Sequence, residues 1–311
     1  MRFALTGTVL SFAALALAAP ASTLLRTSSN DTDVDILQFA LTLEHLENAF
    51  YKQALSMWTQ DDFVAANFTP EFFTQVKYIT HNEKRHVLFL EDTLRAAGVE
   101  PVPACSYQFN LSGPQDFVKK AAVIEGVGGG AYVGAAPLLA SKQYLTAAAS
   151  IVVTESLHQG AFRNAAGEIP MANPFGTALS ARTAYSAASP FIVSCPPTAH
   201  IDVQRFPELT LAQGLPVAPN ESVAFTVAAG GPAVPSPAYV TFLSGLDTVP
   251  VTASVSGNQI TCMVPPQLSG QSYAFVTSDD SSTNLTDSGV LYGPAIVEVT
   301  PGSPTFNVSV T

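Results

Sequence analysis

Glutamate, histidine and tyrosine residues recur in the first half of the chain in one sparse pattern that occurs twice. Each copy has a Glu-x6-Tyr segment followed at a distance by a Glu-x-x-His motif. The copies are Glu44 to Tyr51 with Glu83 to His86, and Glu125 to Tyr132 with Glu155 to His158. One Glu from each of two helices plus Glu-x-x-His from each of two others is the ligand set of a dinuclear metal centre in a four-helix bundle. The spacing predicts metal ligation by Glu44, Glu83, His86, Glu125, Glu155 and His158.

Four long helices must position these residues. Apolar residues recur every three to four positions, which predicts helices over about 33–58, 70–97, 115–137 and 142–166. Glu44 lies about as many residues before the end of its helix as Glu83 lies after the start of the next. Because a helix advances about 1.5 Å per residue, the two glutamates are expected at the same level of the bundle. The second pair of helices repeats this arrangement. All four carboxylates are therefore expected in one layer, with residues 98–114 as a long crossover between two hairpins.

Charge favours metal ions in that layer. Four carboxylates facing one another in a dry bundle would cost several kcal/mol per ion through desolvation alone. Lys84 and Arg85 follow Glu83 on other sides of its helix, so they do not compensate it. Two divalent ions would compensate the four carboxylates. Oxygen ligands with one nitrogen per ion suit iron or manganese, and zinc is a further alternative. The alternative is a metal-free bundle with protonated glutamates.

Several neighbours of the predicted ligands admit two interpretations. Glu47 shares a helix face with Glu44 and is an alternate metal ligand, a support for the ligands or a solvated residue. Tyr51 and Tyr132 either pack in the core with a hydrogen bond or tune the metals as candidate catalytic residues. His45 and His81 are out of phase with the ligands, so we expect them outside the metal layer.

Glycines cluster immediately after Glu125 and would each weaken a helix. Gly126, Gly128, Gly129 and Gly130 predict either a close approach of two helices or an access path.

Composition indicates secretion. Residues 1–19 have the positive start, apolar stretch and small-residue cleavage site of a signal peptide. Only 12% of residues are charged, and glycans would supply hydration at the Asn-x-Ser/Thr sequons Asn30, Asn67, Asn110, Asn220, Asn284 and Asn307. A net charge of −11 without a basic cluster argues against nucleic acid and anionic membrane surfaces as partners. No later segment reads as a membrane span or a lipid-anchor signal.

Three cysteines in an oxidising compartment predict one disulfide and one free thiol. Cys105 and Cys195 lie in Pro-containing loops that flank the helical region, so we expect them to pair. Cys262 lies in an alternating segment and is expected as a buried thiol on a strand.

The sequence changes character near residue 200. Short apolar runs at 224–227, 238–243, 271–276 and 295–299 are separated by Gly, Pro, Asn and Asp, which is typical of antiparallel strands. We therefore predict a multi-domain α and β protein with a signal peptide (1–19), a four-helix bundle (30–199) and a small antiparallel β-sandwich (200–311). Residues 168–200 are expected to wrap the bundle.

The two Glu-x6-Tyr segments at 39–51 and 125–135 and the two Glu-x-x-His pairs resemble the ferritin-like domain of secreted fungal proteins. Members carry labels such as stress-response, desiccation-related and late-sexual-development protein. The resemblance covers about residues 33–166 and implies a ferritin-like bundle with the six ligands above. The wider superfamily includes ferroxidases, manganese catalases, rubrerythrins and oxygenases, so the resemblance transfers no single reaction. The appended sandwich, the sequons and the signal peptide depart from cage-forming ferritins and argue against iron storage.

We expect a secreted protein whose two iron or manganese ions act on a small-molecule oxidant, either peroxide or dioxygen. The alternative is a non-enzymatic surface or matrix protein with a structural metal site, which contacts a wall polymer or matrix partner through its C-terminal domain.

Overall fold

The computed structural model describes residues 33–199, 201–280, 285–300 and 302–304. The expected signal peptide, the first residues of the predicted bundle domain, the predicted boundary residue 200 and the sequons at Asn30, Asn284 and Asn307 lie outside the described residues.

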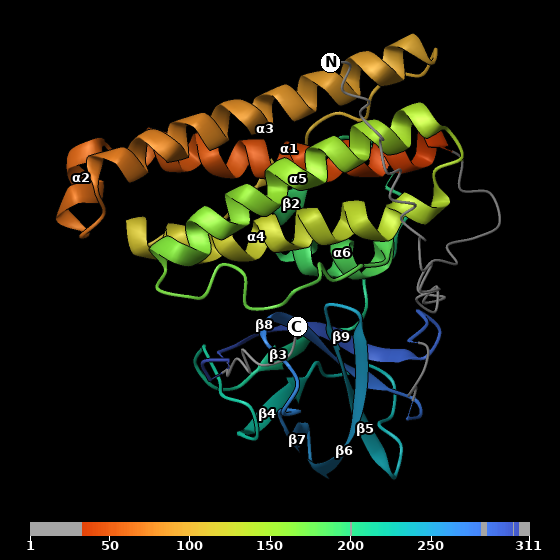
Figure 1. Cartoon of the computed structure of the whole chain (residues 1–311). Helices are drawn as coiled ribbons and strands as arrows, with labels where there is room; N and C mark the ends of the chain where they lie inside the picture. Colours follow the sequence, from red (N-terminus) through yellow and green to blue (C-terminus); the bar gives the residue numbers. More distant parts are fainter. Residues whose placement is uncertain (1–32, 200, 281–284, 301, 305–311) are drawn as a thin grey trace, which may run out of the picture.

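Four long helices form the bundle (Figure 1): α1 (Asp33–Met57), α3 (Pro70–Ala96), α4 (Pro114–Ala135) and α5 (Lys142–Ala165). Their bounds agree with the predicted ones to within two residues. The Thr69 side chain accepts a hydrogen bond from the Phe72 amide, and Pro70 occupies the first turn, so α3 starts as its sequence predicts. Ser141 caps α5 in the same way. Helix α1 packs against α3, and α4 against α5, which gives the two hairpins.

Short helices that the apolar pattern did not reveal complete the helical region. They are α2 (Gln60–Ala65), η1 (Ala136–Leu138), α6 (Ala181–Ala188) and η2 (Ser189–Phe191). A capping box between Thr59 and Asp62 starts α2. Helix α6 packs against α1 and α4, so the segment expected to wrap the bundle contains a helix that covers one of its faces.

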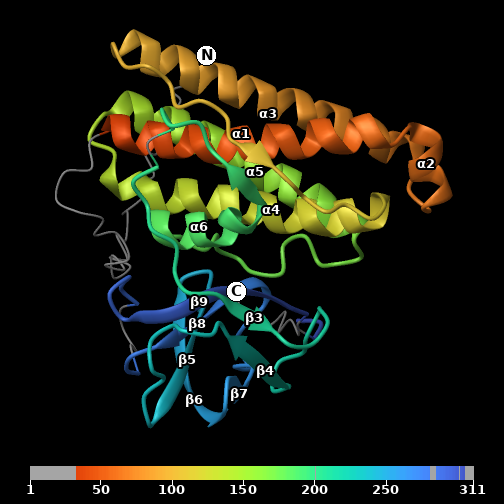
Figure 2. The ribbon, with the colours of Figure 1, turned by 180° about the vertical axis from the view of Figure 1, so that it is seen from behind.

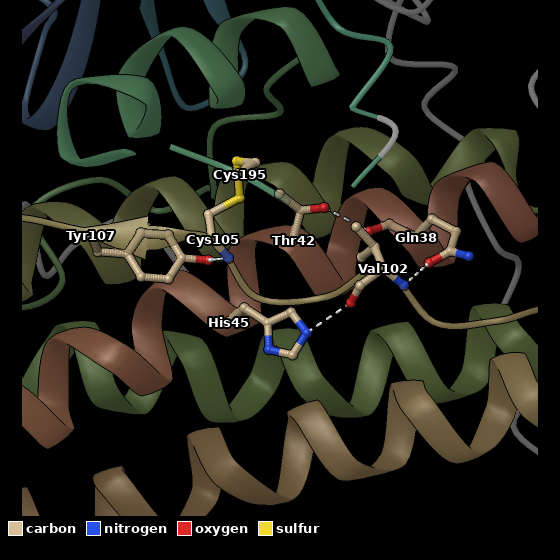
Figure 3. The surroundings of a disulfide bond; sticks show 7 residues. All are labelled: Gln38, Thr42, His45, Val102, Cys105, Tyr107 and Cys195. Atoms are coloured by element: carbon tan, nitrogen blue, oxygen red, sulfur yellow. Dashed lines mark hydrogen bonds between the residues drawn. A yellow bond between two sulfur atoms is a disulfide. The ribbon is translucent and has the colours of Figure 1, made fainter. Parts of the chain in front are cut away.

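The crossover between α3 and α4 is fastened to the rest of the fold at several points (Figure 3). Its strand β1 (Ser106–Tyr107) pairs with β2 (Ile192–Ser194). Beside this pair a disulfide joins Cys105 to Cys195, the expected pairing. Val102 donates its amide to the Gln38 side chain at 2.7 Å, and its carbonyl lies 3.0 Å from Nε2 of His45. These bonds hold the crossover along α1.

The C-terminal region is an antiparallel sheet of seven strands in the order β3-β4-β7-β6-β5-β8-β9. The strands are β3 (Leu209–Leu211), β4 (Ser222–Val227), β5 (Ala238–Ser244), β6 (Asp247–Ser256), β7 (Gln259–Met263), β8 (Gly270–Thr277) and β9 (Val290–Val299). Strand β3 comes back to β9, and Val217 bridges to Val299, so the sheet is a nearly closed barrel. The rings of Phe225 on β4 and Phe242 on β5 meet across its interior, 6.3 Å apart. The predicted antiparallel C-terminal domain is thus present, as one curled sheet whose halves pack face to face.

The bundle and the sheet share a continuous apolar core, and Figure 2 shows the sheet stacked below α4 and α6. Leu243, Tyr273 and Phe275 of the sheet belong to the same buried cluster as Phe117 and Phe162 of the bundle. Arg163 of α5 forms two hydrogen bonds of 2.7 Å with the carboxylate of Glu298 on β9. The two regions are therefore joined by apolar packing and by a buried ion pair.

Candidate metal centre

Each of the four long helices brings a predicted ligand to the middle of the bundle. Five of the six side chains are buried, with Glu44, Glu83 and Glu155 at 0%, Glu125 at 1% and His158 at 3% exposure. The sixth, His86, has 11% of its side chain exposed. The i, i+3 spacing of each Glu-x-x-His motif places both donors on the inner face of one helix. The structure thus brings together all six residues selected from the sequence.

The two histidines face the carboxylates through the same ring atom. Nδ1 of His86 lies 3.2 Å from Glu155, 3.4 Å from Glu44 and 3.5 Å from Glu83. Nδ1 of His158 lies 2.8 Å from the other oxygen of Glu83 and 3.3 Å from Glu125. The two imidazole rings are 6.2 Å apart between centroids. One carboxylate of Glu83 therefore has one oxygen near each histidine.

The donors fall into two overlapping groups, each of a size that suits one cation. The first comprises Glu44, Glu83, His86 and Glu155, and the second Glu83, Glu125, Glu155 and His158; within each group the ligand atoms lie within 4.8 Å of one another. Glu83 and Glu155 belong to both groups, whereas Glu44 and Glu125 belong to one each. This buried cluster could hold metal ions, with Glu83 and Glu155 shared between two positions.

The donor atoms contact one another, but among the described residues they form no hydrogen bond of good geometry. This holds for both oxygens of Glu83 and of Glu155, for one oxygen each of Glu44 and Glu125, and for Nδ1 of both histidines. A buried polar atom without a partner costs about 1–3 kcal/mol, and more when it is charged. Eight such atoms aimed at a common centre are explained if cations complete them. The residues present therefore fit a metal centre.

The two tyrosines hold the remaining oxygens. Tyr132 donates its hydroxyl hydrogen bond to Oε1 of Glu44 at 2.6 Å. Tyr51 likewise donates a hydrogen bond to Oε1 of Glu125. Each tyrosine thus donates a hydrogen bond to the glutamate of the other sequence repeat. The Oε2 atoms of Glu44 and Glu125 remain available to a cation. In this structure the two residues support the ligands, and they are fully packed in the core.

Asn82 is a functional candidate that the sequence analysis missed. Its side-chain nitrogen lies 3.1 Å from Nε2 of His158. A cation bound at Nδ1 leaves the imidazole proton on Nε2. With the Asn82 amide turned so that its oxygen takes the place of its nitrogen, that oxygen accepts a hydrogen bond from Nε2–H. Its position directly before Glu83 on α3 was the available signal, but an isolated asparagine beside a ligand motif carries no spacing pattern.

Glu47 is buried beside the metal cluster but is not part of either ligand group. Its carboxylate occupies the space above Gly128, where an added Cβ would lie 2.3 Å from Oε1 of Glu47 and 3.1 Å from Oε2 of Glu155. Glu47 also lines an apolar cavity of about 20 Å³ closed by Ala187, Ala188 and Phe191. The absence of a side chain at Gly128 is therefore what admits a fifth carboxylate next to the cluster.

Burial and mutual proximity shift the proton affinities of the cluster. Burial, reinforced by the nearby charge of Glu155, raises the pKa of Glu83 to about 7. Burial likewise raises the pKa values of Glu47, Glu125 and Glu155 above the ordinary value, with further contributions from neighbouring carboxylates. Burial alone would lower the pKa of His158, but Glu125 and Glu83 raise it to about 10. Without cations, the cluster therefore retains protons that bound cations would displace.

The other histidines of the helical region lie outside the cluster, as expected. His45 is buried against the crossover, and burial lowers its pKa. His81 is exposed on α3.

Comparisons with known proteins agree with this architecture. Residues 32–168 match the family model of the ferritin-like domain. The chain is also 25% identical over 257 residues to Protein rds1 of Schizosaccharomyces pombe, an alignment that covers 82% of this chain and 62% of that protein. The chain thus spans less than two thirds of that relative's length. The family match to residues 32–168 and the four-helix bundle together describe this segment as a ferritin-like domain.

Other sequence predictions have partial structural counterparts. Cys262 is a buried free thiol on β7. The described sequons Asn67, Asn110 and Asn220 are exposed, and each has a positive φ, at 68°, 49° and 63°. Within the described residues, no helix has the length and apolar character needed to cross a lipid bilayer.

Proposed function

We propose that this protein is a secreted metalloprotein with a dinuclear iron or manganese centre that acts on peroxide or dioxygen. The observation that carries the proposal is the convergence of four carboxylates and two imidazoles whose inward atoms lack hydrogen-bond partners among the described residues. Four negative charges and two neutral donors match two divalent cations. Oxygen-rich ligands with one nitrogen per ion favour iron or manganese.

The residues would divide the work as their contacts suggest. Glu44, Glu83, His86 and Glu155 would hold one ion, and Glu83, Glu125, Glu155 and His158 the other, so that Glu83 and Glu155 would serve both. Two such ions, when bound, would supply redox chemistry toward a small-molecule oxidant. Tyr51 and Tyr132 would fix the outer glutamates, and the apolar core around them would exclude bulk water.

Secretion is part of the proposal. It rests on the signal-like residues 1–19, the sequons and the disulfide, a bond typical of oxidising compartments. The resemblance to secreted fungal stress and development proteins supports the same assignment. Expression in a fungal host should release a chain whose first residue lies near position 20 and whose mass falls on enzymatic removal of N-glycans. A chain that stays inside the cell with its first residues intact would contradict this part.

Elemental analysis of protein purified without chelator tests the centre. We expect two iron or manganese ions per chain, and loss of both in Glu83→Gln and in Glu155→Gln, because an amide cannot bridge two cations as a carboxylate does. Glu71→Gln, an exposed change on the same helix α3, is the matched control and should retain both ions. Unchanged metal content in the two cluster variants would overturn the proposal.

The competing function is a non-enzymatic surface or matrix protein with a structural metal site. The observation that favours it is the near-complete burial of five of the six donors. A peroxide-turnover assay on the metal-loaded protein separates the two functions. Tightly bound ions without turnover or change of oxidation state would select the structural role.

A further inference from the structure

A cavity of about 300 Å³ lies where the bundle, the loop after α5 and the sheet meet, and it is open to solvent on the side of Met171 and Phe175, which are 76% and 55% exposed. Helix α4 contributes Gly126, Gly129 and Gly130, α5 contributes Val152, Ser156 and Gln159, the loop contributes residues 170–177, and β8 contributes Gln271 and Tyr273. Its volume is at the lower end of the ~300–1,000 Å³ typical of small-molecule sites.

This cavity adjoins the metal cluster. Glu125, which belongs to the second ligand group, is among its lining residues. A Cβ built on Gly129, which also lines the cavity, would lie 3.6 Å from Cβ of Glu155. The glycines of α4 therefore bring the cavity up to the helical turn that carries Glu125.

Strand β8 forms one wall and is fixed to α4 by hydrogen bonds on both sides of Glu125. Gln271 donates to the Val123 carbonyl at 3.1 Å, and the Tyr273 hydroxyl donates to the Gly126 carbonyl at 3.0 Å. A Cβ at Gly126 would lie 2.3 Å from the Gln159 amide and 2.4 Å from Gln271. A side chain at this position would therefore displace the Gln159 and Gln271 amides, including the Gln271 amide that bonds β8 to α4.

The charges at the cavity wall are compensated within the protein. Arg163 is paired with Glu298, and the Glu125 carboxylate faces the metal cluster. The remaining wall combines apolar surface from Val133, Val152 and Phe175 with hydroxyl and amide groups. Those of Ser156, Gln159 and Asn173 each donate a hydrogen bond within the protein, which leaves their oxygens as acceptors for a ligand hydroxyl. An occupant of matching chemistry is uncharged, has an apolar body and carries a hydroxyl group.

We propose that this cavity binds a small neutral molecule of the phenol or alcohol class next to Glu125, and that the C-terminal sheet is present to build its wall. The identity of this molecule as the substrate of the metal centre rests on the proposed function, whereas its binding does not. In this proposal, the sheet helps to determine which small molecules bind next to Glu125 of the bundle.

Three ligands with one ring and different charges test the proposal: benzyl alcohol, benzoate and benzylamine. Binding to the full chain is measured by calorimetry and by NMR shifts, in chelator-treated protein so that cations contribute nothing. We expect benzyl alcohol to bind and the two charged probes to bind at least about tenfold more weakly, because each would bury an unpaired charge.

Cavity-filling variants locate the site. Ser156→Phe should weaken benzyl alcohol about tenfold or more by occupying the cavity, and Gly129→Leu should do the same from α4. Leu157→Phe places the same ring on the neighbouring residue, which is 69% exposed and outside the lining, and should leave binding unchanged. Equal binding of all three probes, or binding unaffected by both filling variants, would overturn the proposal.

Failure of this proposal is distinguishable from failure of the proposed function. A chain that holds two ions but binds none of the probes retains the metal centre and loses the cavity assignment. A chain that binds benzyl alcohol in the cavity but holds no ions retains the binding site and loses its assignment as a substrate site.

Discussion

The Tyr132 hydroxyl reaches across the bundle to Glu44, 88 positions earlier in the chain, and donates to it at 2.6 Å. Tyr51 makes the reciprocal bond to Glu125. The two Glu-x6-Tyr repeats thus support each other's glutamate, and neither repeat builds a complete half-site alone.

Replacing these tyrosines should weaken metal binding without removing a ligand. Tyr51→Phe and Tyr132→Phe each free one glutamate oxygen, and we expect affinity for one of the two ions to fall about 10- to 100-fold. Competition with a metallochromic chelator measures the affinity of each ion. Tyr78→Phe, at a residue 70% exposed on α3, is the control. Unchanged affinities in both buried variants would show that the hydrogen bonds serve packing alone.

Asn82 should orient His158 for ligation. Asn82→Leu removes the hydrogen-bond partner of Nε2, and we expect about 10- to 100-fold weaker binding of the ion next to His158. Asn82→Asp should restore or exceed the original affinity, since a carboxylate accepts the Nε2 proton and makes the imidazole a stronger donor. The same chelator competition checks both variants. Equal losses in the two variants would contradict an orienting role.

The metal-free protein should lose stability as pH rises. The folded-state pKa of Glu83 is raised to about 7 from an ordinary value of 4.5, so its contribution is fully present below pH 4.5 and is lost as pH passes through about 7. The raised pKa of His158 acts in the same direction, with loss as pH passes through about 10. Thermal melts across this range measure the effect.

Cation binding should show the opposite trend, because bound ions displace those protons. The gain in melting temperature on adding Mn²⁺ should therefore grow as pH rises from about 5 to about 8. Glu83→Gln, which removes one titrating carboxyl, should flatten both trends. A metal-free protein whose stability increases over this range would contradict the assignment of raised pKa values.

The ion pair between Arg163 and Glu298 should be important for holding the bundle to the sheet. Both side chains are buried, at 3% and 8% exposure. Removal of Arg163 leaves the Glu298 carboxylate without its cation, and removal of Glu298 leaves Arg163 only the more distant Glu168, at 3.5 Å. We expect Arg163→Met or Glu298→Gln to lower the free energy of unfolding by about 3–5 kcal/mol. Urea denaturation measures the change. The double variant Arg163→Met with Glu298→Leu should recover much of the loss, and additive losses would argue against a coupled pair.

Gly134 should tolerate no side chain. A Cβ there would lie 1.9 Å from the carbonyl oxygen of Leu179, a backbone atom in the segment that leads to α6. We expect Gly134→Ala to destabilise the protein despite a gain of about 1 kcal/mol in helix propensity. Gly160→Ala on α5, where the nearest atom is 3.9 Å away, should show the gain alone. Thermal denaturation of both variants checks the contrast, and equal stabilisation of both would contradict it.

Much of the bundle was predictable because its information is local and periodic. Apolar spacing, Thr69 with Pro70, and the two Glu-x-x-His motifs placed helices α1, α3, α4 and α5 and the six donors in one layer. The tyrosines were ambiguous because Tyr51 and Tyr132 point to glutamates in the opposite repeat, a relationship that spacing within one helix does not contain.

What the sequence did not reveal depends on contacts between distant segments. Helix α6 is only eight residues long, so its apolar period is too short to stand out. The role of Asn82 depends on its contact with His158, which lies on another helix. The cavity beside Glu125 depends on Gln271 and Tyr273, more than 140 residues away. The glycine cluster on α4 predicted a close approach of another helix or an access path, whereas the segment that bonds to α4 there is strand β8.

The disulfide between Cys105 and Cys195 has a mechanical consequence. It closes a loop of 90 residues that contains α4, α5 and α6. Tension applied to the two ends of the chain would run through the sulfur atoms and bypass this loop. In a protein stretched between a wall and its surroundings, Glu125, Glu155 and His158 would therefore lie in an unloaded segment, shielded from the pull for as long as the bond stays oxidised.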